Sequence, residues 1–204
     1  MKINRFVLSE MRVNCYVVYD FDGNRAILID APSGISPVIS FIKENSLALE
    51  AVLLTHAHFD HVQGLYELDH AFKDLDIYLS EDDEALFCSG NKKILKDFGM
   101  LSKETDNEFS YIGKIMTKRL PGNIFGFDVM KTSGHTKGSV CFYSEKEGIL
   151  FSGDTVFLYG YGRYDLGGSM TELFASLKKI KSLDGETMLL PGHGECGKLK
   201  MHLD

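Results

Sequence analysis

The 204-residue sequence predicts an α/β fold, because short apolar strands alternate with amphipathic helical patterns and because polar residues repeatedly follow the apolar runs. The 44% hydrophobic content suffices for a sizeable core. Neither a linker nor an internal repeat divides the chain. We therefore expect one domain over residues 1–204, built from two similar layers.

Strands and helices in the first half follow one another in the order of βαβ units. Asp22 and Gly23 supply the turn of a hairpin, and Ser36 and Pro37 begin a helix as its N-cap and its first helical residue. The expected elements are strands over 14–20, 25–31, 51–55 and 76–80, and helices over 36–46 and 64–72. The strand over 51–55 is apolar on both faces, which indicates burial within a sheet.

The segment over 81–119 is more charged and less periodic than its surroundings. We interpret it as an insertion or lid, with helices around 81–88 and 91–100. The second half then returns to strands over 125–132, 139–145, 148–154 and 187–192, with one helix over 170–183.

Composition and charge exclude several classes of partner. The 22 basic and 29 acidic residues give a net charge of −7 without a basic tail, which disfavours nucleic acid. No export signal opens the chain, and no apolar stretch approaches the ~20 residues that span a bilayer. The cysteines, scattered without a C-x-x-C pair, are Cys15, Cys88, Cys141 and Cys196. We expect a cytoplasmic protein with reduced cysteines, no membrane contact and a small-molecule substrate; the sequence does not determine its oligomeric state.

The stretch THAHFDHVQG, residues 55–64, places four ionisable side chains within six positions directly after an apolar strand. On a helix, His56 and His58 would point about 200° apart, but in an extended loop they project to the same side. Imidazole and carboxylate groups are ligands of zinc, manganese and iron. His56, His58, Asp60 and His61 are more ligands than one structural metal site usually takes from so short a loop. This number indicates two neighbouring ions.

Three further donors occupy similar positions, each after an apolar run and beside glycine. They are His135 in TSGHTKGS, Asp154 in LFSGDT and His193 in LLPGHG. Glycine lets the backbone turn sharply and leaves room near an ion. His70, in a helical stretch, and His202, near the end of the chain, lack this setting, and we expect neither to take part.

Each candidate has an ordinary structural alternative. A single histidine is more often a hydrogen-bonded core or surface residue than a ligand. Asp60 also fits the N-terminal cap of a helix beginning near Val62. The concurrence of all the donors in one kind of setting favours metal binding over these readings.

The motifs THAHFDH, SGHTKGS, FSGDT and LLPGHG, in this order, resemble the metal motifs of the metallo-β-lactamase superfamily, and within it the glyoxalase II type hydrolases. The resemblance extends from Asn14 to about Gly194. It implies an αββα four-layer sandwich in which loops at one edge of two sheets hold the metals.

The resemblance also implies how the donors are divided between two divalent ions. The implied ligands are His56, His58 and His135 for the first metal, Asp60, His61 and His193 for the second, and Asp154 as a bridge to both. Zinc is the expected metal, with iron or manganese as alternatives.

Residues around these motifs are candidates for bracing the ligands or lining the substrate rim. Asp30 matches a family aspartate that braces the ligand loop, although a turn-capping carboxylate fits it equally well. YGRYDLGGS resembles a stretch of short glyoxalase II like proteins. We favour a structural ion pair for Arg163 and Asp165 there; the alternative is a rim that they form with Tyr161.

The implied activity is metal-dependent hydrolysis of a thioester or related acyl ester. Metal coordination lowers the pKa of water from about 15.7 to about 7, so a metal-bridging hydroxide would be the nucleophile, with Asp60 or a metal-bound water handling the proton. Full glyoxalase II enzymes bind glutathione through a C-terminal helical domain, whereas this chain ends eleven residues after His193. S-lactoylglutathione is therefore one candidate among small thioesters, esters and lactones.

Two other functions are compatible with the same donors. One is a persulfide dioxygenase with a single iron on two histidines and one aspartate, and the other is a non-catalytic metal-binding relative. The complete donor set disfavours the second. Antibiotic hydrolysis is disfavoured by the missing export signal and by the pattern around Asp60.

Overall fold

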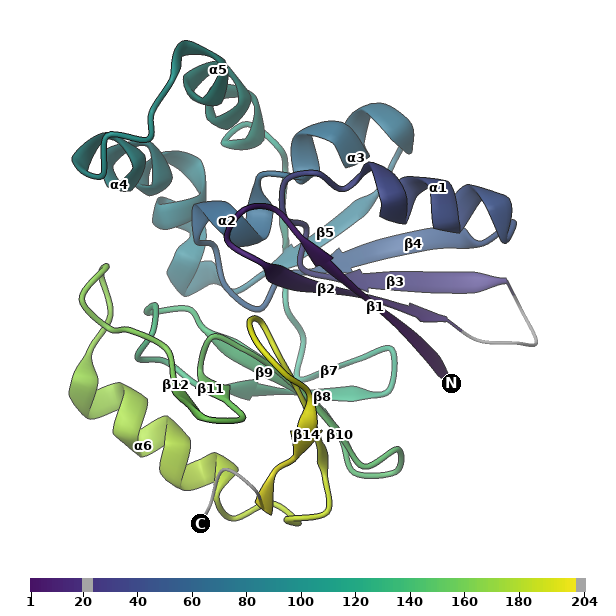
Figure 1. Ribbon diagram of the computed structural model, residues 1–204, viewed down its shortest axis with the longest axis vertical. Coiled ribbons are helices and arrows are strands. Elements are labelled where there is room, and N and C mark those ends of the chain that lie inside the picture. The colour runs from purple at the N-terminus through teal and green to yellow at the C-terminus, as the bar shows by residue number, and fades with distance from the viewer. Residues whose placement is uncertain (20–23, 201–204) are drawn as a thin grey trace.

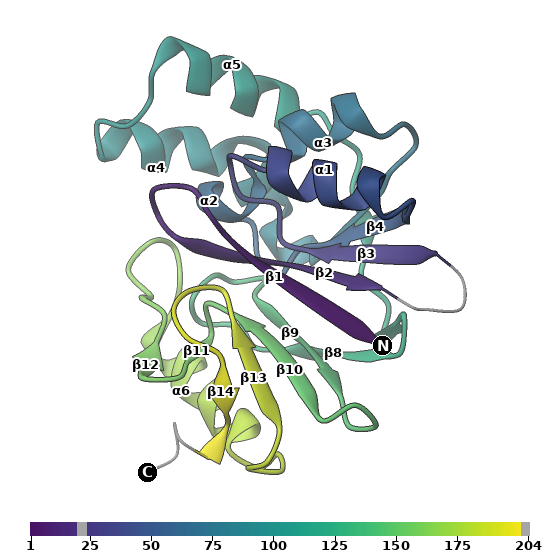
Figure 2. The same cartoon turned by 45° about the vertical axis from the view of Figure 1, so that its right-hand side comes forward.

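The computed structural model describes residues 1–19 and 24–200, in which two β-sheets stack face to face with helices on both outer sides (Figure 1). Helices from the first half of the chain cover the first sheet and α6 covers the second, and the turned view in Figure 2 shows the same layers. The covering helices are α1 (Ser36–Glu44), α3 (Leu65–Ala71), α4 (Asn91–Asp97) and α5 (Lys103–Ile112) on one side and α6 (Met170–Ile180) on the other. The expected αββα sandwich is confirmed.

The first sheet combines an antiparallel edge with a parallel remainder. Its strands, in spatial order, are β1 (Lys2–Leu8), β2 (Val13–Tyr19), β3 (Arg25–Ile29), β4 (Ala48–Leu53), β5 (Asp76–Leu79) and β6 (Lys118–Arg119). Strands β3, β4 and β5 run parallel, so their carboxyl ends lie at one edge. That edge carries the loops that begin at Asp30 and Leu54.

The second sheet presents its loops at the same edge of the molecule. Its strands, in spatial order, are β14 (Gly197–Lys198), β13 (Met188–Pro191), β10 (Ile149–Gly153), β9 (Val140–Ser144), β8 (Phe127–Lys131) and β7 (Asn123–Ile124). A small ribbon of β11 (Val156–Phe157) and β12 (Gly160–Tyr161) follows β10. Strands β10 and β13 are parallel neighbours, which brings the residues after Gly153 and after Pro191 together.

Alternation along the strands builds the core on both faces of each sheet. In β2, Tyr16 and Val18 point between the sheets, whereas Cys15 and Val17 pack beneath the helices. In the second sheet, Phe142 of β9 faces the first sheet and its neighbour Cys141 faces α6. Strands buried on both faces account for the continuous apolar runs of the sequence.

The helix that follows β3 begins one residue earlier than expected. The N-cap is Ile35, so Ser36 lies inside α1 and Pro37 occupies its second position. Ile35 is fully buried, and its carbonyl accepts hydrogen bonds from the amides of Val38 and Ile39, which draws the helix start back. The hairpin turn expected at Asp22 and Gly23 lies outside the described residues.

The segment over 81–119 packs onto the first sheet. It contains a 3₁₀ turn, η1 (Glu81–Asp83), and a π-helical turn, η2 (Leu86–Gly90), in place of the helix expected over 81–88. Helix α5 was not anticipated; its cap is Ser102, whose hydroxyl accepts a hydrogen bond from the amide of Thr105 at 3.1 Å. Phe87 and Phe109 are buried in the same apolar cluster as the inner faces of α1 and α3. Among the described helices, none is long and apolar enough to cross a membrane.

Candidate metal centre

Three of the predicted donors, His56, His58 and His135, form one compact group. The loop after β4 carries His56 and His58, and the backbone at His58 is extended, as their spacing predicted. Nε2 of His135 lies 3.2 Å from Nε2 of His56 and 2.8 Å from Nδ1 of His58. All three side chains are buried, and they form a group with metal-ligand spacing.

Asp60, His61 and His193 form a second group beside the first. The short helix α2 (Phe59–Val62) carries Asp60 and His61, while His193 comes from the loop after β13. Nε2 of His193 lies 3.3 Å from Nε2 of His61 and 3.4 Å from a carboxylate oxygen of Asp60. Asp60 lies within the helix and faces this group, which is not the position of a helix cap.

Asp154 lies between the two groups. Its Oδ1 is 3.4 Å from Nε2 of His61, and its Oδ2 is 3.4 Å from Nε2 of His193 and 3.7 Å from Nε2 of His135. Oδ1 is buried and has no hydrogen-bond partner among the described residues. The fold thus brings all seven predicted side chains together, with the carboxylate of Asp154 within reach of both groups.

Hydrogen bonds at the outer ring nitrogens determine which nitrogen of each histidine faces the centre. Nδ1 of His135 and Nδ1 of His193 donate to the carbonyl oxygens of Arg163 and Met11, at 2.6 and 3.0 Å. A carbonyl cannot donate, so the inner Nε2 atoms keep their lone pairs. In His58 the roles are exchanged, because Nε2 faces the carbonyl of Leu166 at 3.4 Å and Nδ1 faces the centre.

Converging lone pairs, an unpartnered carboxylate oxygen and two close glycines fit a pair of divalent cations. A Cβ at Gly192 would lie 2.2 Å from Oδ1 of Asp154. A Cβ at Gly162 would lie 1.9 Å from the carbonyl oxygen of Asp154. Only glycine therefore allows the surrounding backbone to approach this closely.

The two groups differ in protonation. Burial, with the charges of neighbouring histidines, lowers the pKa of His56 well below its ordinary value, and burial together with His135 lowers the pKa of His58 to about 4. Burial also acts to lower the pKa of His61, but Asp154, Asp30 and Asp60 outweigh it and raise that pKa well above its ordinary value. His56 and His58 are therefore neutral and ready to coordinate a metal ion, whereas His61 must release a proton before it can do so.

The carboxylates of Asp60 and Asp154 are ionised. Burial acts to raise the pKa of Asp154, but the neighbouring His61, His135 and His193 hold it well below its usual range. The pKa of Asp60 is likewise lowered, because His61 and His193 outweigh the effect of burial. Two anionic side chains in one site favour the binding of cations there.

Asp30 connects the end of β3 to the ligand loop. Its buried carboxylate accepts three hydrogen bonds of 2.8 Å, from the amide and the hydroxyl of Thr55 and from Nδ1 of His61. The hydroxyl of Thr55 thereby donates to Asp30 and accepts from Nδ1 of His56 at 3.0 Å. These contacts go beyond capping a turn, because they orient the rings of His56 and His61.

Asn14 holds the loop of His193, and sequence reasoning missed it. Its side-chain amide donates to the carbonyls of Pro191 and Gly194, at 2.8 and 3.0 Å, on both sides of His193. Its backbone amide donates to the carbonyl of Gly192 at 2.7 Å. The partners are about 180 residues apart in the chain, so no local pattern announces this contact.

A cavity of about 290 Å³ opens at the centre. Polar donors of both groups share its lining with apolar walls that include Phe59, Phe98, Met100, Phe157 and Leu166. Arg163 also lines it, lies 5.7 Å from the ring of Phe98 and forms a bidentate ion pair with Asp165 at 2.7 Å. Tyr161 and Asp165 are outside the lining, and the ring of Tyr161 packs against Phe174.

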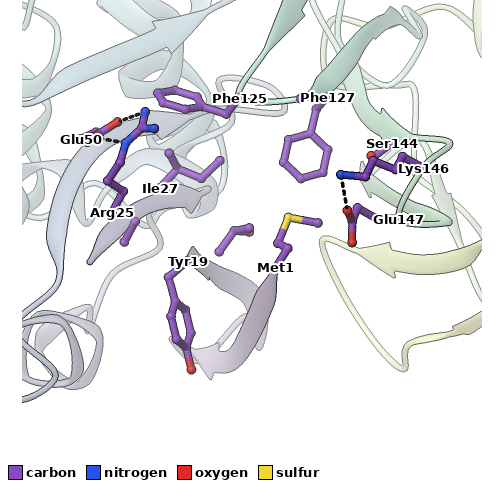
Figure 3. Close-up of a pocket in the computed structure, with 13 residues that line it drawn as sticks. Met1, Tyr19, Arg25, Ile27, Glu50, Phe125, Phe127, Ser144, Lys146 and Glu147 are labelled. Atoms are coloured by element: carbon purple, nitrogen blue, oxygen red, sulfur yellow. Dashed lines mark hydrogen bonds and ion pairs between the residues drawn. The ribbon is translucent and has the colours of Figure 1, made fainter. Parts of the chain in front are cut away.

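A second cavity, of about 370 Å³, lies between the sheets at the opposite end of the strands (Figure 3). Figure 3 shows Arg25 paired with Glu50 on one wall and Lys146 with Glu147 on another. Its described lining contains no histidine or cysteine. The metal-ligand groups lie at the other end, where the carboxyl ends of the parallel strands meet.

The chain belongs to the metallo-β-lactamase superfamily, whose family model matches residues 8–193. A relative, the hydroxyacylglutathione hydrolase of Francisella philomiragia, is 34% identical over 195 residues, which cover 95% of this chain and 68% of the relative. The resemblance to glyoxalase II type hydrolases is confirmed at this level.

Two solved structures are similar to this protein over nearly the whole chain. TTHA1623 in a di-iron-bound form has a TM-score of 0.85 and 33% identity, with 98% of this chain and 96% of that chain covered. The B3 metallo-β-lactamase BLEG-1 has a TM-score of 0.82 and 30% identity, with 100% and 97% covered. Fold and donor set therefore define a metallo-hydrolase.

Proposed function

We propose that this protein hydrolyses thioesters or related acyl esters of small molecules with two divalent metal ions. The observation that carries the proposal is the pair of donor groups that share Asp154 at the wall of an apolar cavity. The relative named hydroxyacylglutathione hydrolase supports a thioester as the bond that is cleaved. A small acyl substrate also suits a cavity of about 290 Å³.

In this proposal His56, His58 and His135 would hold the first ion, Asp60, His61 and His193 would hold the second, and Asp154 would contribute its carboxylate to both. Zinc is the metal we expect; the di-iron form of TTHA1623 makes iron the alternative to test alongside it, with manganese third. When bound, the ions supply an activated water and a Lewis acid for the acyl oxygen.

The chain's own residues position the substrate and move the proton. Asp60 lines the cavity with a side chain that is 12% exposed, so its carboxylate can accept a proton there. The apolar wall of Phe98, Met100 and Leu166 binds the acyl chain by burial, worth roughly 25 cal/mol per Å². Such a wall discriminates weakly between acyl groups, because one methylene changes binding by only about 1–3 kcal/mol.

A panel of thioesters tests the proposal. We expect measurable turnover of several small thioesters, loss of turnover on chelation, and a high KM for S-lactoylglutathione. The sharpest comparison is kcat/KM for S-lactoylglutathione against the same acyl group on a minimal thiol. A preference for the glutathione ester above about a hundredfold, worth ~2.7 kcal/mol, would show a dedicated glutathione site. It would contradict the view that the apolar wall is the main determinant of substrate binding. No turnover of any thioester by metal-loaded protein would refute the proposal.

The similarity to BLEG-1 favours one second candidate, hydrolysis of a β-lactam amide. A chromogenic cephalosporin belongs in the same panel, at the same enzyme and metal concentrations. Oxygen consumption and a metal content near one iron per chain would distinguish persulfide oxygenation from hydrolysis.

A further inference from the structure

We propose that Asp83 is a positioning residue that locks together the two loops carrying His56, His58 and His135. The inference rests on the proposed function in one respect, that these three histidines hold one metal ion. It concerns a residue outside every metal motif of the sequence.

Asp83 is a buried carboxylate, 1% exposed, at the end of the η1 turn that follows β5. It forms no ion pair within the described part of the chain, and three hydrogen bonds take the place of one. They come from the amide of Ala57 at 3.0 Å, the hydroxyl of Thr136 at 2.8 Å and the amide of Gly138 at 2.7 Å. Burying an unpaired carboxylate is costly, so these three donors are what keeps it in place.

The donors belong to two loops that meet only through tertiary structure. Ala57 stands between His56 and His58, so a hydrogen bond to its amide fixes the backbone of both. Thr136 follows His135 directly, and Gly138 lies three residues after it. The side chain of Asp83 therefore bridges two loops whose histidines are 79 residues apart in the chain.

Two further contacts show that the bridge is a built feature. The carbonyl of Ala57 accepts from the side-chain amide of Asn91 at 2.7 Å, so both backbone polar groups of Ala57 are held by the segment over 81–119. A Cβ at Gly138 would lie 2.6 Å from Cγ of Asp83, so the loop approaches the carboxylate as only glycine can. Part of the segment over 81–119, which the sequence suggested was an insertion or lid, thus supports the loops that carry the three histidines.

The bridge acts on one half of the centre. Of the donors to Asp83, none lies in α2, which carries Asp60 and His61, or in the loop of His193. That second group is held by Asp30 and Asn14 instead. Loss of the Asp83 carboxylate should therefore weaken metal binding by the three-histidine group and leave metal binding by the other group largely unchanged.

Cobalt(II) titrations of single-group backgrounds test this selectivity. His193→Ala leaves the three-histidine group, and His58→Ala leaves the group of Asp60, His61 and His193. In the first background, Asp83→Asn should weaken cobalt binding by about 10–100-fold, the range seen when a partner of a metal ligand is removed. In the second background, the change should stay within about threefold.

Asp82→Asn is the matched control, since it removes the same charge one residue away. Among the residues that the structure describes, the Asp82 carboxylate forms ion pairs with the ends of Lys131 and Lys137, at 3.5 and 3.9 Å. It should change cobalt affinity by less than about twofold in either background. An equal loss in both backgrounds on Asp83→Asn would show a general structural role and overturn the inference, as would no loss in either. Absence of cobalt binding by the His193→Ala protein itself would contradict the proposed three-histidine group.

Two measurements keep the inference falsifiable if Asp83→Asn does not fold. Thr136→Val removes one of the three donors at constant volume and should weaken cobalt binding in the His193→Ala background by about threefold to tenfold, with Thr136→Ser restoring it. Hydrogen exchange of metal-free protein should show faster exchange of the Ala57 and Gly138 amides when the bridge is weakened. Unchanged affinity and exchange in Thr136→Val would refute the bridge.

Discussion

Replacing Asp30 with asparagine is the most informative single change at the centre, because it keeps shape and removes only charge and one acceptor oxygen. Asp30 is 1% exposed and has φ of 58°, a left-handed conformation that asparagine tolerates. The wild-type carboxylate accepts from the amide of Thr55 through Oδ1, and from the hydroxyl of Thr55 and Nδ1 of His61 through Oδ2.

Asparagine has one oxygen for these three donors, so one orientation fails at one donor and the other orientation fails at two. If its oxygen takes the place of Oδ2, the new NH₂ faces the amide of Thr55 and leaves a buried donor unsatisfied. If its oxygen takes the place of Oδ1, the NH₂ faces both the hydroxyl of Thr55 and Nδ1 of His61, and this nitrogen must then accept. The ring proton of a neutral His61 would move to Nε2, the atom that faces His193 and Asp154.

The expected effect follows from these two cases. One unsatisfied buried donor should lower the free energy of unfolding of the metal-free protein by about 1–3 kcal/mol. A disfavoured tautomer of a metal-binding histidine should weaken zinc binding by about 10–100-fold. Urea unfolding with a chelator present measures the first quantity, and competition with a chromophoric chelator measures the second.

Asp74→Asn is the control, because Asp74 has the same φ of 58° and is exposed. It should leave stability and zinc affinity unchanged. If Asp30→Asn matches this control in both measurements, the contacts of Asp30 do not orient His61, and the reasoning above is wrong.

Three further predictions follow from the same geometry. Metal-replete protein should contain about two ions per chain and lose activity on chelation; a content that stays near one would favour the mono-iron dioxygenase. Asp154→Ala should abolish hydrolysis and reduce occupancy at both sites, so near-normal turnover would contradict a shared carboxylate. The exposed Arg163 guanidinium lowers the pKa of Asp165 to about 2, so the ion pair is present above the ordinary carboxyl pKa of about 4 and is lost as the pH falls through about 2. A carboxyl-carbon NMR titration should show this, and Arg163→Met should return the pKa of Asp165 towards its ordinary value.

The local pattern of the sequence determined the strands and the chemistry of the donors. In β2, for example, successive side chains point to opposite faces of the sheet, so Cys15 and Tyr16 belong to different apolar clusters. This follows from strand geometry alone and does not depend on what packs against each face. The two-residue spacing of His56 and His58 requires extended backbone if both are to face one ion, and the backbone at His58 is extended. Such features depend on neighbours in the chain, and they are visible without the fold.

Only the tertiary structure decided what supports those donors. Strand β3 lies beside β4, and β10 beside β13, so the residues after their carboxyl ends meet although they are distant in sequence. Asp83, Asn14 and the carbonyl of Met11 then hold the ligand loops through contacts that span up to 182 residues. An aspartate in an acidic run and an asparagine in a strand carry no local sign of these roles. Their partners are backbone amides and carbonyls, which every residue possesses, so only the strand order selects them.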